Sequence, residues 1–249
     1  MITYKDSEKP KINNGNIGIV ADALAGFSEP FVLVHGAGSF GHPIVKRTGI
    51  NKGISDSGQL LAFAETQILQ NKLNYLFCDA LVKKGIPAFP AQLSSYAILE
   101  KGRLLPMKVD AITGLLQLGM VPVCYGVPAF DKVQGSAILS GDQIVPYLAK
   151  CLGASRIILA GDLEGIFTAD PHVSKEARLI RIINSANFNM IEGFLSGSAV
   201  TDVTGGMKKK YIELIEAAQN GIICQIVHFK SLKDALNGES VGTVIDLSA

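Results

Sequence analysis

A glycine-rich segment, Leu33 to Pro43, contains residue types that can bind a phosphate group. Its sequence, LVHGAGSFGHP, begins with an apolar run that predicts a buried strand, and its glycines allow backbone N–H groups to converge on an anion. His35 and His42 stand at the two ends of the loop, where an imidazole can donate a hydrogen bond to a phosphate oxygen. An ordinary strand-to-helix turn also contains such glycines, but a histidine directly after the last glycine favours a phosphate site.

A second group of candidate residues lies in the carboxyl-terminal half of the chain. Gly205 and Gly206 precede three consecutive lysines in the segment DVTGGMKKK, which predicts the start of a helix. Free N–H groups at a helix N-terminus attract phosphate, so these glycines are candidates for binding a phosphate group. The two lysines before Lys210 are more typical of a solvated helix start. The Thr204 hydroxyl could donate to phosphate or cap the helix.

The composition excludes several classes of protein. The chain of 249 residues is 48% hydrophobic and 18% charged, which is typical of one cytoplasmic α/β domain or two closely joined lobes. A net charge of +1 argues against a broad nucleic-acid-binding surface. The N-terminus is too charged for a signal peptide and no apolar run approaches the ~20 residues that span a bilayer, so we expect no membrane partner. The four cysteines are widely spaced and are expected to be reduced core thiols.

Helices and strands must position these residues. Residues 1–16 predict a polar surface loop, and residues 46–58 predict an irregular, flexible cover beside the glycine loop. The longest predicted helix, residues 59–84, has apolar residues at mixed spacings of three and four, which predicts one broad apolar face. The residues of that face are Leu60, Phe63, Ile68, Leu69, Leu73, Leu76 and Phe77.

Predicted strands and helices alternate along the rest of the chain, which predicts a mostly parallel sheet covered on both faces by helices. Val121–Tyr125 predicts a buried strand whose end, at Gly126, lies near the glycine loop if the two strands are neighbours. A helix follows Ser140-Gly141-Asp142, where Ser140 or Asp142 could act only as a cap. The further helices are expected at 16–26, 108–118, 143–152, 187–195 and up to residue 220. The further strands are expected at 88–90, in a hairpin within 93–105, at 155–160 and 222–228, and at an edge at 242–245.

The order of the motifs HGAGSFGH, SGD, GDLEGIFTADP, DVTGGMKKK and GTVI resembles the amino acid kinase superfamily, most closely its isopentenyl phosphate kinase branch. The resemblance covers nearly the whole chain. It implies a single domain over 1–249, an αβα sandwich with a mostly parallel central sheet. Residues 1–135 would form the phosphoryl-acceptor lobe and residues 136–249 the nucleotide lobe.

The resemblance implies a role for each candidate residue. His42 would donate to a phosphate oxygen of isopentenyl phosphate, and Lys5 would bridge the two reacting phosphates. Lys210 would bind the ATP phosphates, and Asp142 would orient the lysines. The other substrate-binding positions implied are Gly36, Ala37, Gly38, Gly41 and Gly126. The other ATP-binding positions implied are Asp162, Gly165, Gly205 and Gly206, with no protein metal ligand.

The activity implied is ATP- and Mg²⁺-dependent phosphorylation of isopentenyl phosphate by a cytoplasmic homodimer. Two alternatives remain: a fosfomycin kinase-like phosphonate kinase, which shares the histidine, and a non-catalytic nucleotide-binding member that lacks the first phosphate loop. The hydrocarbon tail of the acceptor is expected against the 59–84 helix, near Phe63, Ile68 or Phe77. The histidines expected to be structural are His35, His172 and His228.

The chain departs from the family pattern at several positions. The family begins with a strand ending in Lys-x-Gly-Gly-Ser, and the segment Ile2–Lys5 matches the residues directly after it. We therefore expect an upstream segment to encode that strand, and the chain as given to be less stable and less active without it. At three positions this chain differs from what the family commonly has. Ala37 stands where the family more often has glycine. Val127 stands where it usually has aspartate, and Gln143 stands where a second acidic residue commonly follows the equivalent of Asp142.

Overall fold

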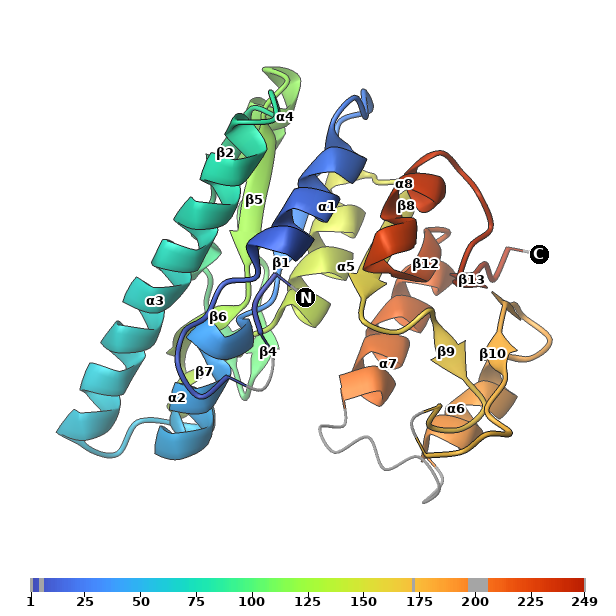
Figure 1. Cartoon of the computed structure of the whole chain (residues 1–249). Coiled ribbons are helices and arrows are strands. Elements are labelled where there is room, and N and C mark those ends of the chain that lie inside the picture. The colour runs from blue at the N-terminus through green and yellow to red at the C-terminus, as the bar shows by residue number, and fades with distance from the viewer. Residues whose placement is uncertain (1, 5–6, 172, 197–205, 249) are drawn as a thin grey trace. The chain divides into compact units, whose positions relative to one another are not determined.

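The computed structural model describes residues 2–4, 7–171, 173–196 and 206–248, which form alternating helices and strands (Figure 1). The chain divides into two compact units, residues 1–144 and 145–249. The sequence placed the border between the lobes near residue 135. Each unit combines helices with parallel strand pairs, so the predicted α/β class is confirmed.

The first unit contains a three-stranded parallel sheet. Its strands are β1 (Leu33–His35), β5 (Val121–Tyr125) and β2 (Ala88–Pro90), in the order β1-β5-β2. Every residue of β5 is buried, because β5 lies between the other two strands. The helices of this unit are α1 (Asn14–Leu24), α2 (His42–Thr48), α3 (Ser57–Val82), α4 (Asp110–Gln117) and the start of α5 (Gly141–Leu152). Figure 1 shows α3 running along the sheet, and it packs against β2 and β5.

A second sheet of the first unit has the order β4-β3-β6-β7. Its strands are β3 (Leu99–Glu100), β4 (Arg103–Leu104), β6 (Val127–Asp131) and β7 (Gly135–Leu139). The predicted hairpin turn is confirmed, because Lys101 and Gly102 have φ angles of 50° and 78°. The hairpin formed by β6 and β7 was not predicted from the sequence.

The buried face of α3 differs from the predicted one. Leu60 and Ile68 are 57% and 67% exposed, so the expectation of one apolar face containing both is wrong. Leu73 and Phe77 of the predicted face are buried, and the helix also buries polar side chains at every fourth position, which are Thr66, Gln70 and Asn74. Apolar residues occur all around this helix, so the sequence alone did not identify the side that faces the sheet.

Two segments expected to be loops are more ordered than predicted. Thr3 forms an isolated antiparallel bridge with Ile12, and the side chain of Thr3 is buried. The segment expected to be irregular from residue 46 begins inside α2 and continues as a short 3₁₀ turn, Ile50–Lys52. Ile50 is fully buried, so this segment contributes to the core rather than only covering the loop.

The second unit has a four-stranded sheet in the order β11-β13-β12-β8. Its strands are β8 (Arg156–Gly161), β11 (Ile182–Ile183), β12 (Ile223–His228) and β13 (Thr243–Ile245), beside a small pair of β9 (Ile166–Phe167) and β10 (Leu179–Ile180). The final strand was predicted at an edge of the sheet, and this prediction is wrong, because β13 lies between β11 and β12. The remaining helices of this unit are α6 (Phe188–Ser196), α7 (Gly206–Gln219) and α8 (Leu232–Leu236).

The four cysteines are free, as predicted, but they are not all core residues. Cys78, Cys124 and Cys224 are buried, and burial raises the pKa of each thiol, to about 12 for Cys124. Cys151 is exposed, so the expectation of a core position is wrong for this residue.

Candidate active site

The glycine loop begins where β1 ends, next to the end of β5. His35 is in register with Tyr125, and the Gly126 N–H donates to the His35 carbonyl oxygen over 3.1 Å. A Cβ at Gly126 would lie 3.1 Å from the Gly141 nitrogen at the start of α5. The predicted meeting of Gly126 with the glycine loop is therefore confirmed, and the helix that carries Asp142 starts at the same place.

The loop residues have different structural requirements. Gly38 has a φ of +50°, a conformation that other residues rarely adopt, whereas Ala37 is in the right-handed helical region and needs no glycine. Gly41 has a φ of −136°, but a Cβ there would approach the Ala37 Cβ to 2.8 Å. A Cβ at Gly36 would meet no described atom within 4 Å. Conformation explains Gly38 and space explains Gly41.

The N-terminal segment holds the loop through Ser39. The Ser39 N–H donates to Thr3 Oγ1 over 3.3 Å, and the Lys11 N–H donates to Ser39 Oγ over 3.1 Å. The predicted phosphate-bridging residue Lys5 lies outside the described residues. Thr3 and Lys11, which precede and follow it in the sequence, both contact the loop through Ser39.

Helix α3 contacts the loop from another side through Gln70. The Gln70 side chain is fully buried, and its Nε2 donates to the Ala37 carbonyl oxygen over 3.3 Å. Its Oε1 is buried and has no hydrogen-bond partner among the described residues. An unsatisfied buried polar atom costs about 1–3 kcal/mol, so this side chain is not optimised for stability.

His35 is a structural residue, as predicted. Its Nδ1 lies 3.0 Å from the Gly36 carbonyl oxygen and its Nε2 lies 3.2 Å from Asn74 Oδ1. The ring stacks on Tyr125 and meets Phe77 edge-on. Burial lowers the pKa of the imidazole, although these two contacts oppose the shift. His35 therefore fixes the end of β1 rather than facing a ligand.

His42 has a different environment from His35. It is the first residue of α2, directly after Gly41, and its side chain is exposed. An exposed imidazole at the end of the glycine loop has access to a ligand that the loop would bind.

Of the other histidines, His228 accepts a hydrogen bond from the Lys230 N–H and packs on Phe229, as expected for a structural residue, and His172 lies outside the described residues.

The start of α5 is tied to the hairpin of β3 and β4 by Gln143. Its Nε2 donates to the Gly102 carbonyl oxygen, and its Oε1 accepts from the Leu104 N–H, each over 3.0 Å. A carboxylate could not make the first of these bonds because it has no donor. This geometry explains why an amide, rather than the usual acid, follows Asp142 in this chain.

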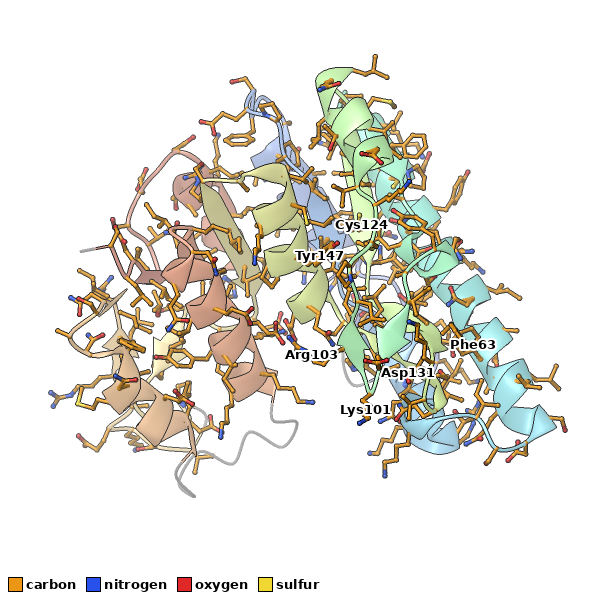
Figure 2. All side chains as sticks on the ribbon, turned by 180° about the vertical axis from the view of Figure 1, so that it is seen from behind. Phe63, Lys101, Arg103, Cys124, Asp131 and Tyr147 are labelled. Carbon is orange, nitrogen blue, oxygen red and sulfur yellow. The ribbon has the colours of Figure 1, made fainter. Side chains whose placement is uncertain are left out.

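Asp131, which the sequence analysis did not identify, also holds this hairpin, and Figure 2 labels it near the hairpin residues Lys101 and Arg103. The carboxylate is buried and accepts from the Gly102 N–H over 2.7 Å, the Val133 N–H over 2.9 Å and the Gln134 N–H over 3.2 Å. Burial disfavours the charge, but these backbone donors outweigh it and hold the pKa of Asp131 below its ordinary value.

The candidate nucleotide residues belong to the second unit. Asp162 directly follows β8, and Gly206 is the first residue of α7, which also carries the half-buried Lys210. A Cβ at Gly165 would collide with Thr243 Oγ1, and that hydroxyl accepts from the Ile166 N–H over 2.8 Å. Packing alone therefore requires a glycine at 165. Gly205 lies outside the described residues.

The three residues expected near an apolar tail lie in different environments. Phe77 is buried against His35, Phe63 is half-buried, and Ile68 is 67% exposed. Nine helical positions separate Ile68 from Phe77, which places them on opposite sides of α3. Phe63 fits a ligand wall best among the three, and its contact with the tail stays a prediction.

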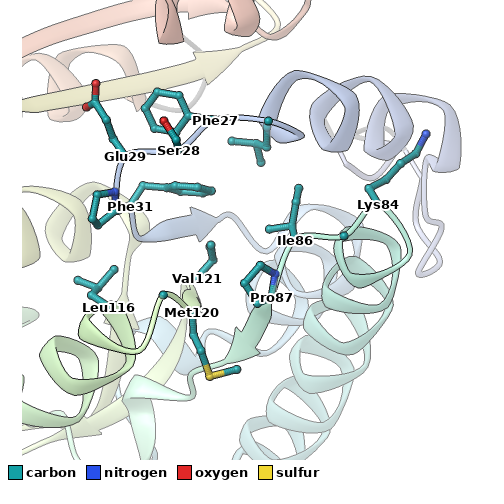
Figure 3. A pocket seen from close by; sticks show the side chains of 15 residues that line it. Phe27, Ser28, Glu29, Phe31, Lys84, Ile86, Pro87, Leu116, Met120 and Val121 are labelled. Carbon is teal, nitrogen blue, oxygen red and sulfur yellow. The ribbon is translucent and has the colours of Figure 1, made fainter.

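A pocket of about 180 Å³ lies at the opposite end of the three-stranded sheet from the glycine loop (Figure 3). Residues preceding β1, β2 and β5 line it, including Phe27, Phe31, Pro87 and Met120. Ligands of open α/β sheets bind outside the carboxyl ends of the strands, and this pocket is at the amino ends. It is therefore separate from the candidate acceptor site.

The described residues contain no group of three or more His, Cys, Asp or Glu side chains that could hold a metal ion. In the same part of the chain, no helix has both the length and the apolar character that crossing a bilayer requires.

Comparisons with known proteins agree with this geometry. The sequence profile of the amino acid kinase family matches residues 10–228. The isopentenyl phosphate kinase of Methanothermobacter thermautotrophicus is 37% identical over 97% of this chain and 93% of its own length. That of Methanocaldococcus jannaschii is 35% identical over 87% of this chain and 81% of its own. A crystal structure of an isopentenyl phosphate kinase superimposes with a TM-score of 0.84 at 33% identity, over 98% of this chain and 96% of that one.

Proposed function

The chain belongs to the amino acid kinase family, and we propose that it transfers the γ-phosphoryl group of ATP to isopentenyl phosphate. The products are isopentenyl diphosphate and ADP. The similarity to isopentenyl phosphate kinases over almost the full length of both chains carries this proposal. The exposed His42 after the glycine loop supports it further, because it places a hydrogen-bond donor where an acceptor phosphate would lie.

The first unit supplies the groups that suit the acceptor. In the reaction, a terminal oxygen of isopentenyl phosphate forms a bond to the γ-phosphorus while the bond from that phosphorus to the bridging oxygen of ADP breaks. Two anions must approach each other, so neutralising charge and fixing an in-line geometry are the main tasks of the protein. Residues 36–38 of the loop would offer backbone N–H groups, whereas the N–H groups of Ser39, Phe40 and Gly41 donate within the protein, which contradicts the expected phosphate contact of the Gly41 amide. His42 would donate to a phosphate oxygen. Lys5 would bridge the reacting phosphates.

The second unit supplies the groups that suit ATP. Gly206 at the start of α7 would face the phosphates together with Gly205, which precedes it in the sequence, and Lys210 would neutralise their charge. Asp162 after β8 would contact the nucleotide, and Asp142 at the start of α5 would orient the lysines. We infer that Mg²⁺ arrives on the ATP phosphates and neutralises charge there, because that ion commonly keeps few protein ligands.

The proposed cellular form is a cytoplasmic homodimer. Free cysteines fit a reducing compartment. Exposed apolar residues recur every seven positions along α3, a spacing that forms a seam between packed helices, and these are Leu61, Ile68, Tyr75 and Val82. Light scattering on the wild type and on Ile68→Glu tests the dimer. The wild type should have twice the mass of the chain. The variant should dissociate into monomers at a higher protein concentration than the wild type does. A monomeric wild type would contradict the proposal.

A coupled assay of ADP release tests the activity. We expect ATP-dependent turnover of isopentenyl phosphate that stops when EDTA removes Mg²⁺ and returns when the ion is added. Fosfomycin serves as the competing acceptor, because a phosphonate kinase of the same fold would prefer it. Turnover of fosfomycin without turnover of isopentenyl phosphate would contradict the proposed substrate. ATP binding without transfer to either acceptor would indicate a nucleotide-binding protein instead.

A further inference from the structure

Helix α3 places the amide of Gln70 directly against the glycine loop. The side chain is fully buried, and its Nε2 donates to the Ala37 carbonyl oxygen over 3.3 Å. A Cβ at Gly41 would lie 2.9 Å from the same nitrogen. Gln70 therefore contacts the loop near both of its ends, and it occupies the space that a side chain at position 41 would need.

Stability does not account for this residue. Gln70 Oε1 is buried without a partner among the described residues, and the one bond of the amide is long. A methionine of similar volume would fill the same space without burying an unpaired oxygen. The polar residues one turn away differ, because Thr66 Oγ1 donates to the Ala62 carbonyl oxygen over 2.7 Å and Asn74 bonds to His35 and the Val123 carbonyl oxygen.

The bond from Gln70 fixes the orientation of one peptide group. The Ala37 carbonyl oxygen accepts from Gln70 Nε2 and from the Phe40 N–H, so both of its lone pairs are directed into the protein. The peptide between Ala37 and Gly38 is trans and planar, so the Gly38 N–H and the Ala37 C=O lie in one plane and point in opposite directions. Holding the oxygen toward α3 therefore directs this N–H away from α3.

We propose that Gln70 is a positioning residue for the phosphoryl acceptor: it keeps the Ala37 carbonyl oxygen away from the bound phosphate and presents the Gly38 N–H to it. The inference rests on the proposed function, because it requires the loop to receive an acceptor phosphate. A carbonyl oxygen turned toward the anion would repel it, whereas an N–H donates a charge-assisted hydrogen bond. Gln70 thereby tunes binding of the acceptor without touching ATP.

Steady-state kinetics with isopentenyl phosphate and ATP varied separately test this role. Gln70→Met should raise the KM for isopentenyl phosphate at least tenfold, change the KM for ATP less than twofold, and melt at or above the temperature of the wild type. Gln70→Asn keeps the amide but is too short to reach the Ala37 carbonyl oxygen, so it should raise the same KM. Thr66→Val is the matched control, because it removes a buried hydroxyl of the same helix face that does not touch the loop, and it should behave as the wild type.

A binding measurement without ATP separates the inference from the proposed function. With ¹⁵N-labelled glycine, the Gly38 amide signal of the wild type should shift on titration with isopentenyl phosphate, and both Gln70 variants should need at least tenfold more ligand. Binding by the wild type without turnover would contradict the kinase function but leave this titration as the test of Gln70. Wild-type affinity in both folded variants, an equal rise in the KM for ATP, or no binding by the wild type would overturn the inference.

Discussion

Replacing Asp131 with asparagine should destabilise the first unit by about 2–4 kcal/mol. The carboxylate accepts backbone N–H groups from Gly102 on one oxygen and from Val133 and Gln134 on the other, and the Lys101 N–H stabilises the same charge. An asparagine has one oxygen, so at least one of these donors would face an NH₂ group. The loss of one hydrogen bond to a charged acceptor is worth about 1.5–3 kcal/mol, and a buried N–H left without a partner adds to that cost.

Thermal unfolding of the wild type and of Asp131→Asn measures this effect. For a domain of this size, 1 kcal/mol corresponds to roughly 2–4 °C, so we expect the melting temperature to fall by about 4–16 °C at pH 7. Glu100→Gln is the matched control, because it removes the same charge from an exposed position in β3, in the hairpin that Asp131 contacts, and should change little.

The pH dependence provides a second test of the same reasoning. The pKa of Asp131 is lowered in the folded state, so its stabilising contribution is present above the unfolded value of about 3.9 and is lost as the pH falls through the folded pKa. The difference in melting temperature between wild type and variant should therefore shrink below about pH 4. Equal melting temperatures at pH 7, or a difference that grows on acidification, would refute the argument.

Three further predictions concern the acceptor side. His42→Ala should lower turnover of isopentenyl phosphate by about 10²–10³-fold while ATP binding persists, with partial activity in His42→Gln, and an unchanged rate would remove His42 from the mechanism. Gln143→Glu should lose its bond to the Gly102 carbonyl oxygen and therefore melt at a lower temperature at pH 7. In acid the carboxyl regains a proton that it can donate, so the melting temperature, followed by circular dichroism, should recover towards that of the wild type. Gly38→Ala should destabilise the chain by roughly 1–2 kcal/mol and weaken acceptor binding, because its φ is +50° and a Cβ would collide with Thr3 Oγ1; wild-type stability in denaturant would contradict this.

Local chemistry was sufficient to predict the elements that present the candidate residues. The strand Val121–Tyr125 was predicted with its observed bounds, because a β-branched apolar run is limited by glycines on both sides. Lys101-Gly102 formed the predicted turn, since glycine tolerates the positive φ that a tight hairpin needs. The glycine loop and His42 were likewise identified from residue type and order alone. The sequence also placed Gly126 beside the loop, through the rule that parallel strands end at one edge.

Tertiary contacts decided what sequence patterns could not. The buried side of α3 includes Gln70 and Asn74 because their side chains meet backbone carbonyl oxygens there, and no spacing rule identifies such partners in advance. A Cβ at Gly41 would meet Gln70 Nε2 at 2.9 Å as well as the neighbouring Ala37 Cβ at 2.8 Å, and Gln70 is 29 positions away in sequence. The strand β13 is internal because β11 and β12 both pair with it. In each case the deciding atom comes from a distant segment, so only the folded chain reveals it.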